Sequence, residues 1–114
     1  MARAKYVILL PIRLNDGADV PARQLESYLD ELYVLADGYT VAGVVEGAYR
    51  MQAGAKQVDP ALEVWVVLDQ ARERTLRAWL RRVGRELGQE AMYLERTGGV
   101  VAFVPGVRRK RRRS

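Results

Sequence analysis

The chain has no cysteine and no histidine among its 114 residues. The first absence excludes disulfides, thiolate nucleophiles and cysteine-type zinc sites. The second removes the commonest metal ligand and the usual general base near neutral pH. No glycine-rich loop has the strand, turn and helix context of a phosphate-binding motif either. We therefore predict no metal site and no cofactor.

Long hydrophobic runs are also missing. The apolar stretch from Tyr6 to Leu10 is far shorter than the roughly 20 residues that span a bilayer, and no signal-peptide cleavage pattern follows it. We expect a cytoplasmic protein with no membrane partner. The apolar content of 49% and charged content of 29% are those of an ordinary globular protein. The length fits a single domain, which we assign to residues 1–107.

Positive charge is concentrated at the end of the chain. Six of the nineteen basic residues fall in the segment 108–114, whereas the residues before it have thirteen basic against all fourteen acidic side chains. Adjacent like charges repel and bury no apolar area, which predicts a disordered basic C-terminal arm. Such an arm could neutralise the phosphates of DNA or RNA. The predicted contacts are Arg108, Arg109, Lys110, Arg111, Arg112 and Arg113. A solubility tail, a remnant of cloning and attraction to anionic lipid are the alternatives.

Hydrophobic periodicity predicts alternating strands and helices. The expected strands are 5–10, 39–51, 61–68, 91–96 and 100–104, and the expected helices are 21–37 and 70–87. The first and third strands are apolar on both faces, so we place them centrally. This order predicts an α+β, ferredoxin-like split βαβ fold: βαββαβ plus an extra C-terminal strand, with two helices on one face of an antiparallel sheet.

Glycines mark two of the expected boundaries and irregularities. Gly38 is predicted to end the first helix in a left-handed conformation. Gly43 and Gly47 lie inside the second expected strand and predict a twisted or bulged edge, or a place where another group approaches the backbone.

The second expected helix has an apolar stripe and an arginine stripe on opposite sides. The arginine stripe consists of Arg74, Arg77, Arg81 and Arg85. These residues could extend the nucleic-acid contact of the arm onto a rigid surface. A solvated helix face explains them as well, because Glu73 and Arg77, like Arg82 and Glu86, have the i,i+4 spacing of supporting ion pairs.

The sheet face without helices has to be covered or used. Its candidate aromatic residues are Tyr6, Tyr49, Trp65 and Tyr93. Aromatic side chains on such a face stack bases in RNA-recognition domains, but the aromatic motif of those domains is missing here. We favour a second copy of the chain on this face, which makes the protein a homodimer.

Evidence for catalysis is thin, because no pair of acid and base groups has a diagnostic spacing. We expect a non-enzymatic protein and no catalytic residues. The alternative is a small-ligand sensor or enzyme that uses the open sheet face or a ligand rim at the junction of the second helix and the last strands. The rim residues are Gln89, Glu90, Tyr49 and Arg50. A protein-interaction module is a further alternative.

The segment Leu87 to Glu95, LGQEAMYLE, resembles the end of small bacterial proteins of unknown function, in which a Gly-Gln-Glu-Ser/Ala element precedes the last strand. The stretch from Gly38 to Arg50 is similar as well. The resemblance implies a ferredoxin-like fold and no agreed activity. Composition and resemblance together predict a bacterial, nucleic-acid-associated accessory protein, with a dimeric domain and a cationic arm that contacts phosphates. The sequence does not decide between DNA and RNA.

Overall fold

The structure, a computed structural model, describes residues 3–50, 56–98 and 101–107, with the backbone alone at 49–50, 56–57 and 101–103. The predicted basic arm lies outside the described residues. In chain order the elements are β1 (Arg3–Pro11), α1 (Ala22–Leu35), β2 (Gly38–Arg50), β3 (Lys56–Asp69), the 3₁₀ turn η1 (Gln70–Arg72), α2 (Glu73–Glu86), β4 (Ala91–Arg96) and β5 (Val101–Pro105). No helix in these ranges is long and apolar enough to cross a bilayer.

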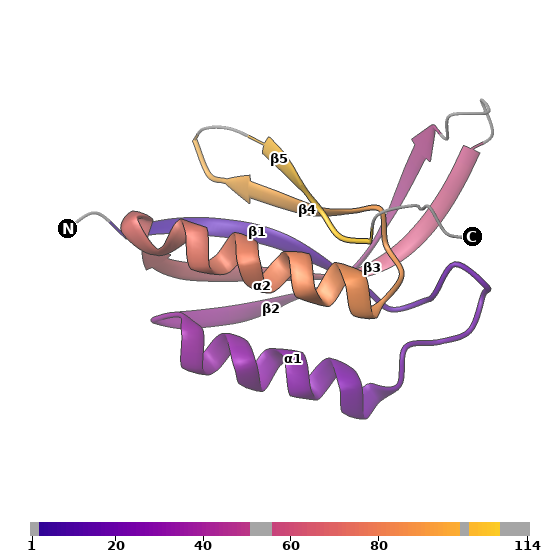
Figure 1. Cartoon of the computed structure of the whole chain (residues 1–114), viewed down its shortest axis with the longest axis horizontal. Helices are drawn as coiled ribbons and strands as arrows, with labels where there is room; N and C mark the ends of the chain where they lie inside the picture. Colours follow the sequence, from indigo (N-terminus) through magenta and orange to yellow (C-terminus); the bar gives the residue numbers. More distant parts are fainter. Residues whose placement is uncertain (1–2, 51–55, 99–100, 108–114) are drawn as a thin grey trace.

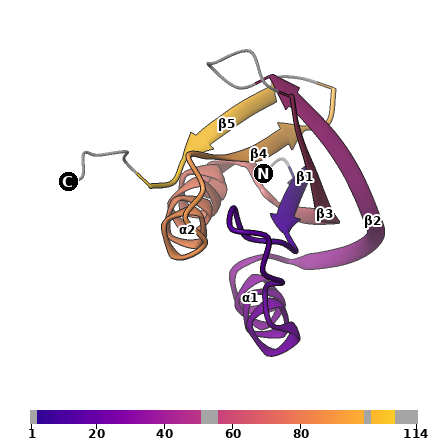
Figure 2. The same cartoon turned by 90° about the vertical axis from the view of Figure 1, so that its right-hand side faces the viewer.

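The five strands form one antiparallel sheet in the order β2-β3-β1-β4-β5. β1 and β3 are interior neighbours, as their two-sided apolar pattern predicts. Both helices lie on the same side of the sheet, and β2 and β3 extend beyond the other strands (Figures 1 and 2). The predicted α+β class is confirmed, and the strand order is consistent with a ferredoxin-like arrangement extended by β5.

The core lies between the helices and one face of the sheet. β1 and β3 contribute alternate residues to it, and α2 contributes its apolar stripe. The side chains with no exposed surface include Tyr6, Ile8, Leu10, Val64, Val66, Leu68, Leu76, Leu80 and Val83. Burial of each large apolar side chain contributes about 1.5–3 kcal/mol, so this layer is the main source of stability.

One residue lies on the opposite face from the one predicted. Tyr6 pairs with Val66 across β1 and β3 and is buried under the helices, so its assignment to the uncovered face is wrong. The sequence pattern could not choose the face, because Val7 and Leu9 on the other side of β1 are also apolar.

The boundaries of β2 and β3 differ from the prediction at two places. α1 ends at Leu35, and Gly38 opens β2 without a left-handed conformation, so the predicted role of Gly38 at the helix end is wrong. The register of β2 shifts between Val41 and Gly43, where Gly43 has φ of 135°, which confirms the predicted bulge. β3 begins at Lys56, five residues before the expected start of the strand 61–68.

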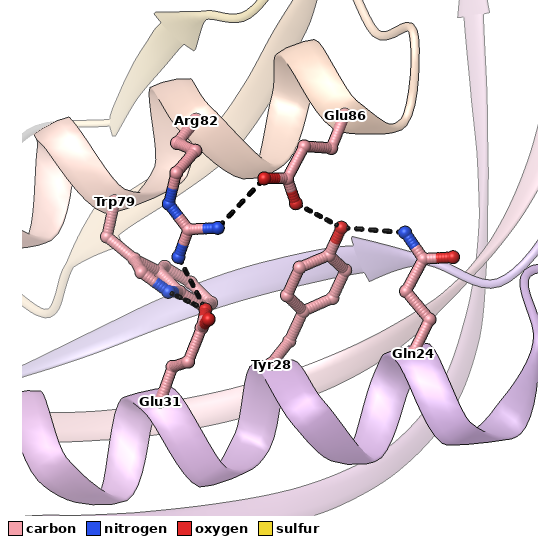
Figure 3. Close-up of polar contacts among 6 residues, drawn as sticks. All are labelled: Gln24, Tyr28, Glu31, Trp79, Arg82 and Glu86. Atoms are coloured by element: carbon pink, nitrogen blue, oxygen red, sulfur yellow. Dashed lines mark hydrogen bonds and ion pairs between the residues drawn. The ribbon is translucent and has the colours of Figure 1, made fainter.

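A polar network joins the facing sides of α1 and α2 (Figure 3). The Tyr28 hydroxyl donates to Glu86 at 2.8 Å and accepts from the Gln24 amide at 2.9 Å. Arg82 then bridges Glu86 of its own helix and Glu31 of α1, and the Trp79 indole N–H also donates to Glu31. Burial raises the pKa of Tyr28, and its hydroxyl therefore acts as a neutral donor.

Candidate nucleic-acid interface

The outward face of α2 carries the predicted arginine stripe. Arg74, Arg81 and Arg85 are exposed, and within the described ranges they have no ion-pair partner. Arg77 differs from them because its Nε lies 2.8 Å from Glu73 Oε2. The predicted i,i+4 pairs of Glu73 with Arg77 and of Arg82 with Glu86 are both confirmed. Three of the four stripe residues thus keep guanidinium groups available to an external anion.

The end of β5 packs against α2 beside this stripe. Gly106 lies against Gly84 so closely that a Cβ added at Gly84 would be 2.8 Å from the Gly106 Cα. The next backbone N–H, that of Val107, donates to the Gln89 carbonyl at 2.7 Å. The last described residue is therefore fixed at the C-terminal end of α2.

Helix geometry relates this anchor to the arginines. At about 100° per residue, the four stripe arginines lie within about 100° of Gly84 on one side, and the core residues Leu80 and Val83 lie on the other. Gly84 thus lies at the border between the two stripes, and Gly106 packs at that border. The basic arm is covalently attached at this point.

A second cluster, which the sequence does not reveal, lies at the first turn of α2. The carboxylate of Glu73 accepts from the Tyr6 hydroxyl at 3.0 Å and from Arg96 Nη1 at 3.2 Å, in addition to Arg77. Burial alone would raise the pKa of Glu73, but hydrogen bonds from Arg77 and Tyr6 and the charges of both arginines outweigh it, so the pKa is lowered. Glu73 is therefore ionised at neutral pH.

This cluster borders a cavity of about 180 Å³. Its walls are Tyr6, Glu73, Arg77, Leu94 and Arg96. Arg96 comes to Glu73 only because β1 and β4 pair Tyr6 with Arg96. The i,i+4 spacing of Glu73 and Arg77 can be read from the sequence, but the pairing of Tyr6 with Arg96 between β1 and β4 cannot.

The predicted ligand rim is spread over separate elements. The Gln89 amide donates to the Leu87 carbonyl at 3.2 Å and to Asn15 Oδ1 at 3.4 Å, which ties the loop after β1 to the end of α2. Tyr49 and Arg50 lie in β2, and β1 and β3 separate that strand from β4, which follows Glu90. The side chains of Tyr49 and Arg50 lie outside the described part of the structure.

The uncovered face of the sheet carries two of the predicted aromatic residues. Trp65 is half-buried, with the Lys5 ammonium 3.8 Å from its ring centroid, and its indole N–H donates to Glu63. The Tyr93 hydroxyl donates to Glu95 at 3.1 Å on the same face. Each ring therefore has a polar neighbour that orients it.

Neither a search for metal-binding groups nor a comparison with known protein families adds to the site. Among the described residues, no group of three or more acidic side chains could hold a metal ion. No family model and no curated protein matches the chain. The resemblance to small bacterial proteins therefore stays a prediction.

A search of solved structures finds a similar fold. The match is a phage SAM lyase in complex with S-methyl-5′-thioadenosine, with a TM-score of 0.62 over 91% of this chain and 90% of that one. The two sequences are 9% identical. At that identity the likeness concerns the arrangement of helices and strands.

Proposed function

We propose that this protein is a cytoplasmic, non-enzymatic accessory protein that binds nucleic acid through its basic arm and the exposed arginines of α2. The observation that supports this most is the position of Val107, whose N–H is bonded to Gln89 at the end of α2. An extended segment of seven residues reaches at most about 25 Å from there. The fourteen residues of α2 span about 21 Å. The arm and the stripe can therefore reach one phosphate backbone together.

Electrostatics favours the same partner. Arg74, Arg81 and Arg85 have no carboxylate neighbour in the described ranges that would compete with a phosphate. Contacts of arginine with phosphates release counterions and do not depend on base sequence. Binding should consequently be general and strongly weakened by salt.

The test is a salt titration of binding to a fluorescent single-stranded oligonucleotide. The slope of log K against log salt is negative, and its magnitude should fall by about 0.7 for each phosphate contact removed. Arg81→Gln and Arg85→Gln should each reduce the magnitude of the slope by about that amount, and removal of residues 108–114 should reduce it further. Arg3→Gln is the matched control, because Arg3 is an exposed arginine on β1 that pairs with Asp37. An unchanged slope in the arm deletion would refute the proposal.

The proposal includes a homodimer formed through the uncovered sheet face. Two arms on one particle raise the apparent affinity through effective concentration. The face offers Val67, which is 36% exposed, next to half-buried Trp65 and Val7. Light scattering coupled to gel filtration should give twice the chain mass for the wild type and a lower mass for Val67→Lys. A monomer at every concentration would remove this part of the proposal.

Small-ligand binding is a second candidate, favoured by Trp65 and Tyr93 on the uncovered face. The phage lyase of similar fold carries a nucleoside, S-methyl-5′-thioadenosine, which serves as a probe. Binding at this face should quench the fluorescence of Trp65. The quenching should be absent from Trp65→Phe and should persist when the arm is removed. Trp79→Phe is the control, because Trp79 is buried between the helices. No quenching at millimolar nucleoside would dismiss this candidate.

A further inference from the structure

The cavity beside the first turn of α2 has the residues of an anion site. Two guanidinium groups from different elements, Arg77 on α2 and Arg96 on β4, line it together with the hydroxyl of Tyr6. Its volume of about 180 Å³ is far above the roughly 15 Å³ that one water needs. The side chains of Arg77 and Arg96 are 36% and 37% exposed, so an ion from solvent can reach them.

Glu73 shows that an oxyanion fits between the two arginines. Its Oε2 lies 2.8 Å from Arg77 Nε and its Oε1 lies 3.2 Å from Arg96 Nη1. Each guanidinium has five N–H donors, whereas one carboxylate offers about four acceptor positions. The two positive charges also exceed the single negative charge of Glu73. Glu73 thus fills one side of the site, and the net charge of the three side chains is positive.

We propose that Arg77 and Arg96 bind a phosphate-type oxyanion in this cavity, with Glu73 as an internal competitor. Planar guanidinium groups recognise phosphate through paired N–H donors. The two positive charges of Arg77 and Arg96 are balanced by a dianion but not by a single carboxylate. Glu73 is the first residue of α2, and only its side chain has to turn away to admit the ligand. The site does not depend on the basic arm and goes beyond the proposed function.

The competitor role makes opposite predictions for two variants. In Glu73→Gln the negative charge is removed at nearly constant shape, and the affinity for inorganic phosphate should rise several-fold. In Arg96→Gln the affinity should fall about tenfold or more, because a charge-assisted contact is lost. Arg23→Gln is the matched control: it removes one exposed arginine from α1, outside the cavity, and its affinity should equal that of the wild type.

The experiment is calorimetric titration of the full chain with inorganic phosphate at constant ionic strength, with chloride as the reference anion. Circular dichroism of each variant checks folding, and Arg77→Lys, which keeps the charge but loses the guanidinium fork, provides a second variant with an expected several-fold loss. Equal affinities of Arg96→Gln and Arg23→Gln, or lower affinity in Glu73→Gln, would overturn the proposal.

Two further arms identify the source of the phosphate and separate this site from the arm. A nucleoside 5′-monophosphate that competes with inorganic phosphate points to a small phosphorylated ligand, and competition by an oligonucleotide without terminal phosphate points to a nucleic-acid backbone. Deletion of 108–114 should leave the effects of Glu73→Gln and Arg96→Gln unchanged. If those differences vanish with the arm, the cavity is not the site, whatever the outcome of the salt titration.

Discussion

The contact between Gly84 and Gly106 allows a prediction with a defined sign. A Cβ at Gly106 would lie 2.4 Å from the Gln89 carbonyl oxygen and 2.8 Å from the Gly84 Cα. These are backbone atoms, and they cannot rotate away. Gly106→Ala should therefore push the end of β5 off the helix. The same movement would lengthen the hydrogen bonds from Gly106 to Glu90 and from Val107 to Gln89, which measure 3.0 and 2.7 Å.

The cost can be estimated from these contacts. Overpacking typically costs about 1–3 kcal/mol, and each weakened hydrogen bond adds up to about 1 kcal/mol. We expect Gly106→Ala to lower the free energy of unfolding by about 3 kcal/mol. Gly84→Ala is the sharper case, since alanine is favoured over glycine by about 1 kcal/mol in a helix interior. Because its Cβ would lie 2.8 Å from Gly106 and 3.0 Å from Met92, we expect a net loss of about 1 kcal/mol.

Urea unfolding followed by circular dichroism measures these differences through the transition midpoint. Gly38→Ala is the control, because no atom lies within 4 Å of the added Cβ and its backbone is not left-handed. Its stability should stay within about 0.5 kcal/mol of the wild type or rise slightly. The reasoning is refuted if Gly84→Ala is more stable than the wild type, as helix propensity alone would give, or if Gly106→Ala matches Gly38→Ala.

Two other predictions concern the polar clusters of the helices. Tyr28→Phe removes the hydroxyl between Gln24 and Glu86 and should lower the free energy of unfolding by about 1 kcal/mol, whereas Tyr33→Phe, at a residue 73% exposed, should have no measurable effect in the same thermal scan. The lowered pKa of Glu73 means that its ionised contacts stabilise the fold above its ordinary value of 4.5 and are lost as the pH falls through the folded-state pKa. Stability measured from pH 6 to pH 2 should therefore decline less in Glu73→Gln than in the wild type, and parallel curves would contradict this assignment.

Local patterns predict most of the fold for a physical reason. The helix 70–87 follows from the stripe that includes Leu76 and Leu80, and the structure has helical turns from Gln70 to Glu86. The central position of β1 and β3 follows from their two-sided apolar residues, because only interior strands under cover bury both sets. Asp69, whose side chain accepts from the Ala71 N–H at 2.9 Å, caps the 3₁₀ turn η1 that leads into α2.

What the sequence could not predict depends on register between distant segments. The cluster around Glu73 needs Tyr6 and Arg96 from two strands, and their pairing is fixed only when β1 and β4 meet. The packing of Gly106 against Gly84 is equally non-local. Nothing in the sequence around either glycine indicates that another backbone segment lies against it. Local periodicity contains no information on either contact.

Register also changes what the charge count implies. The residues before the arm are nearly neutral in sum, yet the described carboxylates are not shared evenly among the arginines. Glu73 takes Arg77 and Arg96, and Glu31 and Glu86 both hold Arg82. Arg74, Arg81 and Arg85 have no such neighbour in the described part of the chain. A scaffold whose formal charge is close to zero thus has one helix face with uncompensated positive charge, at the edge where the chain passes into its basic segment.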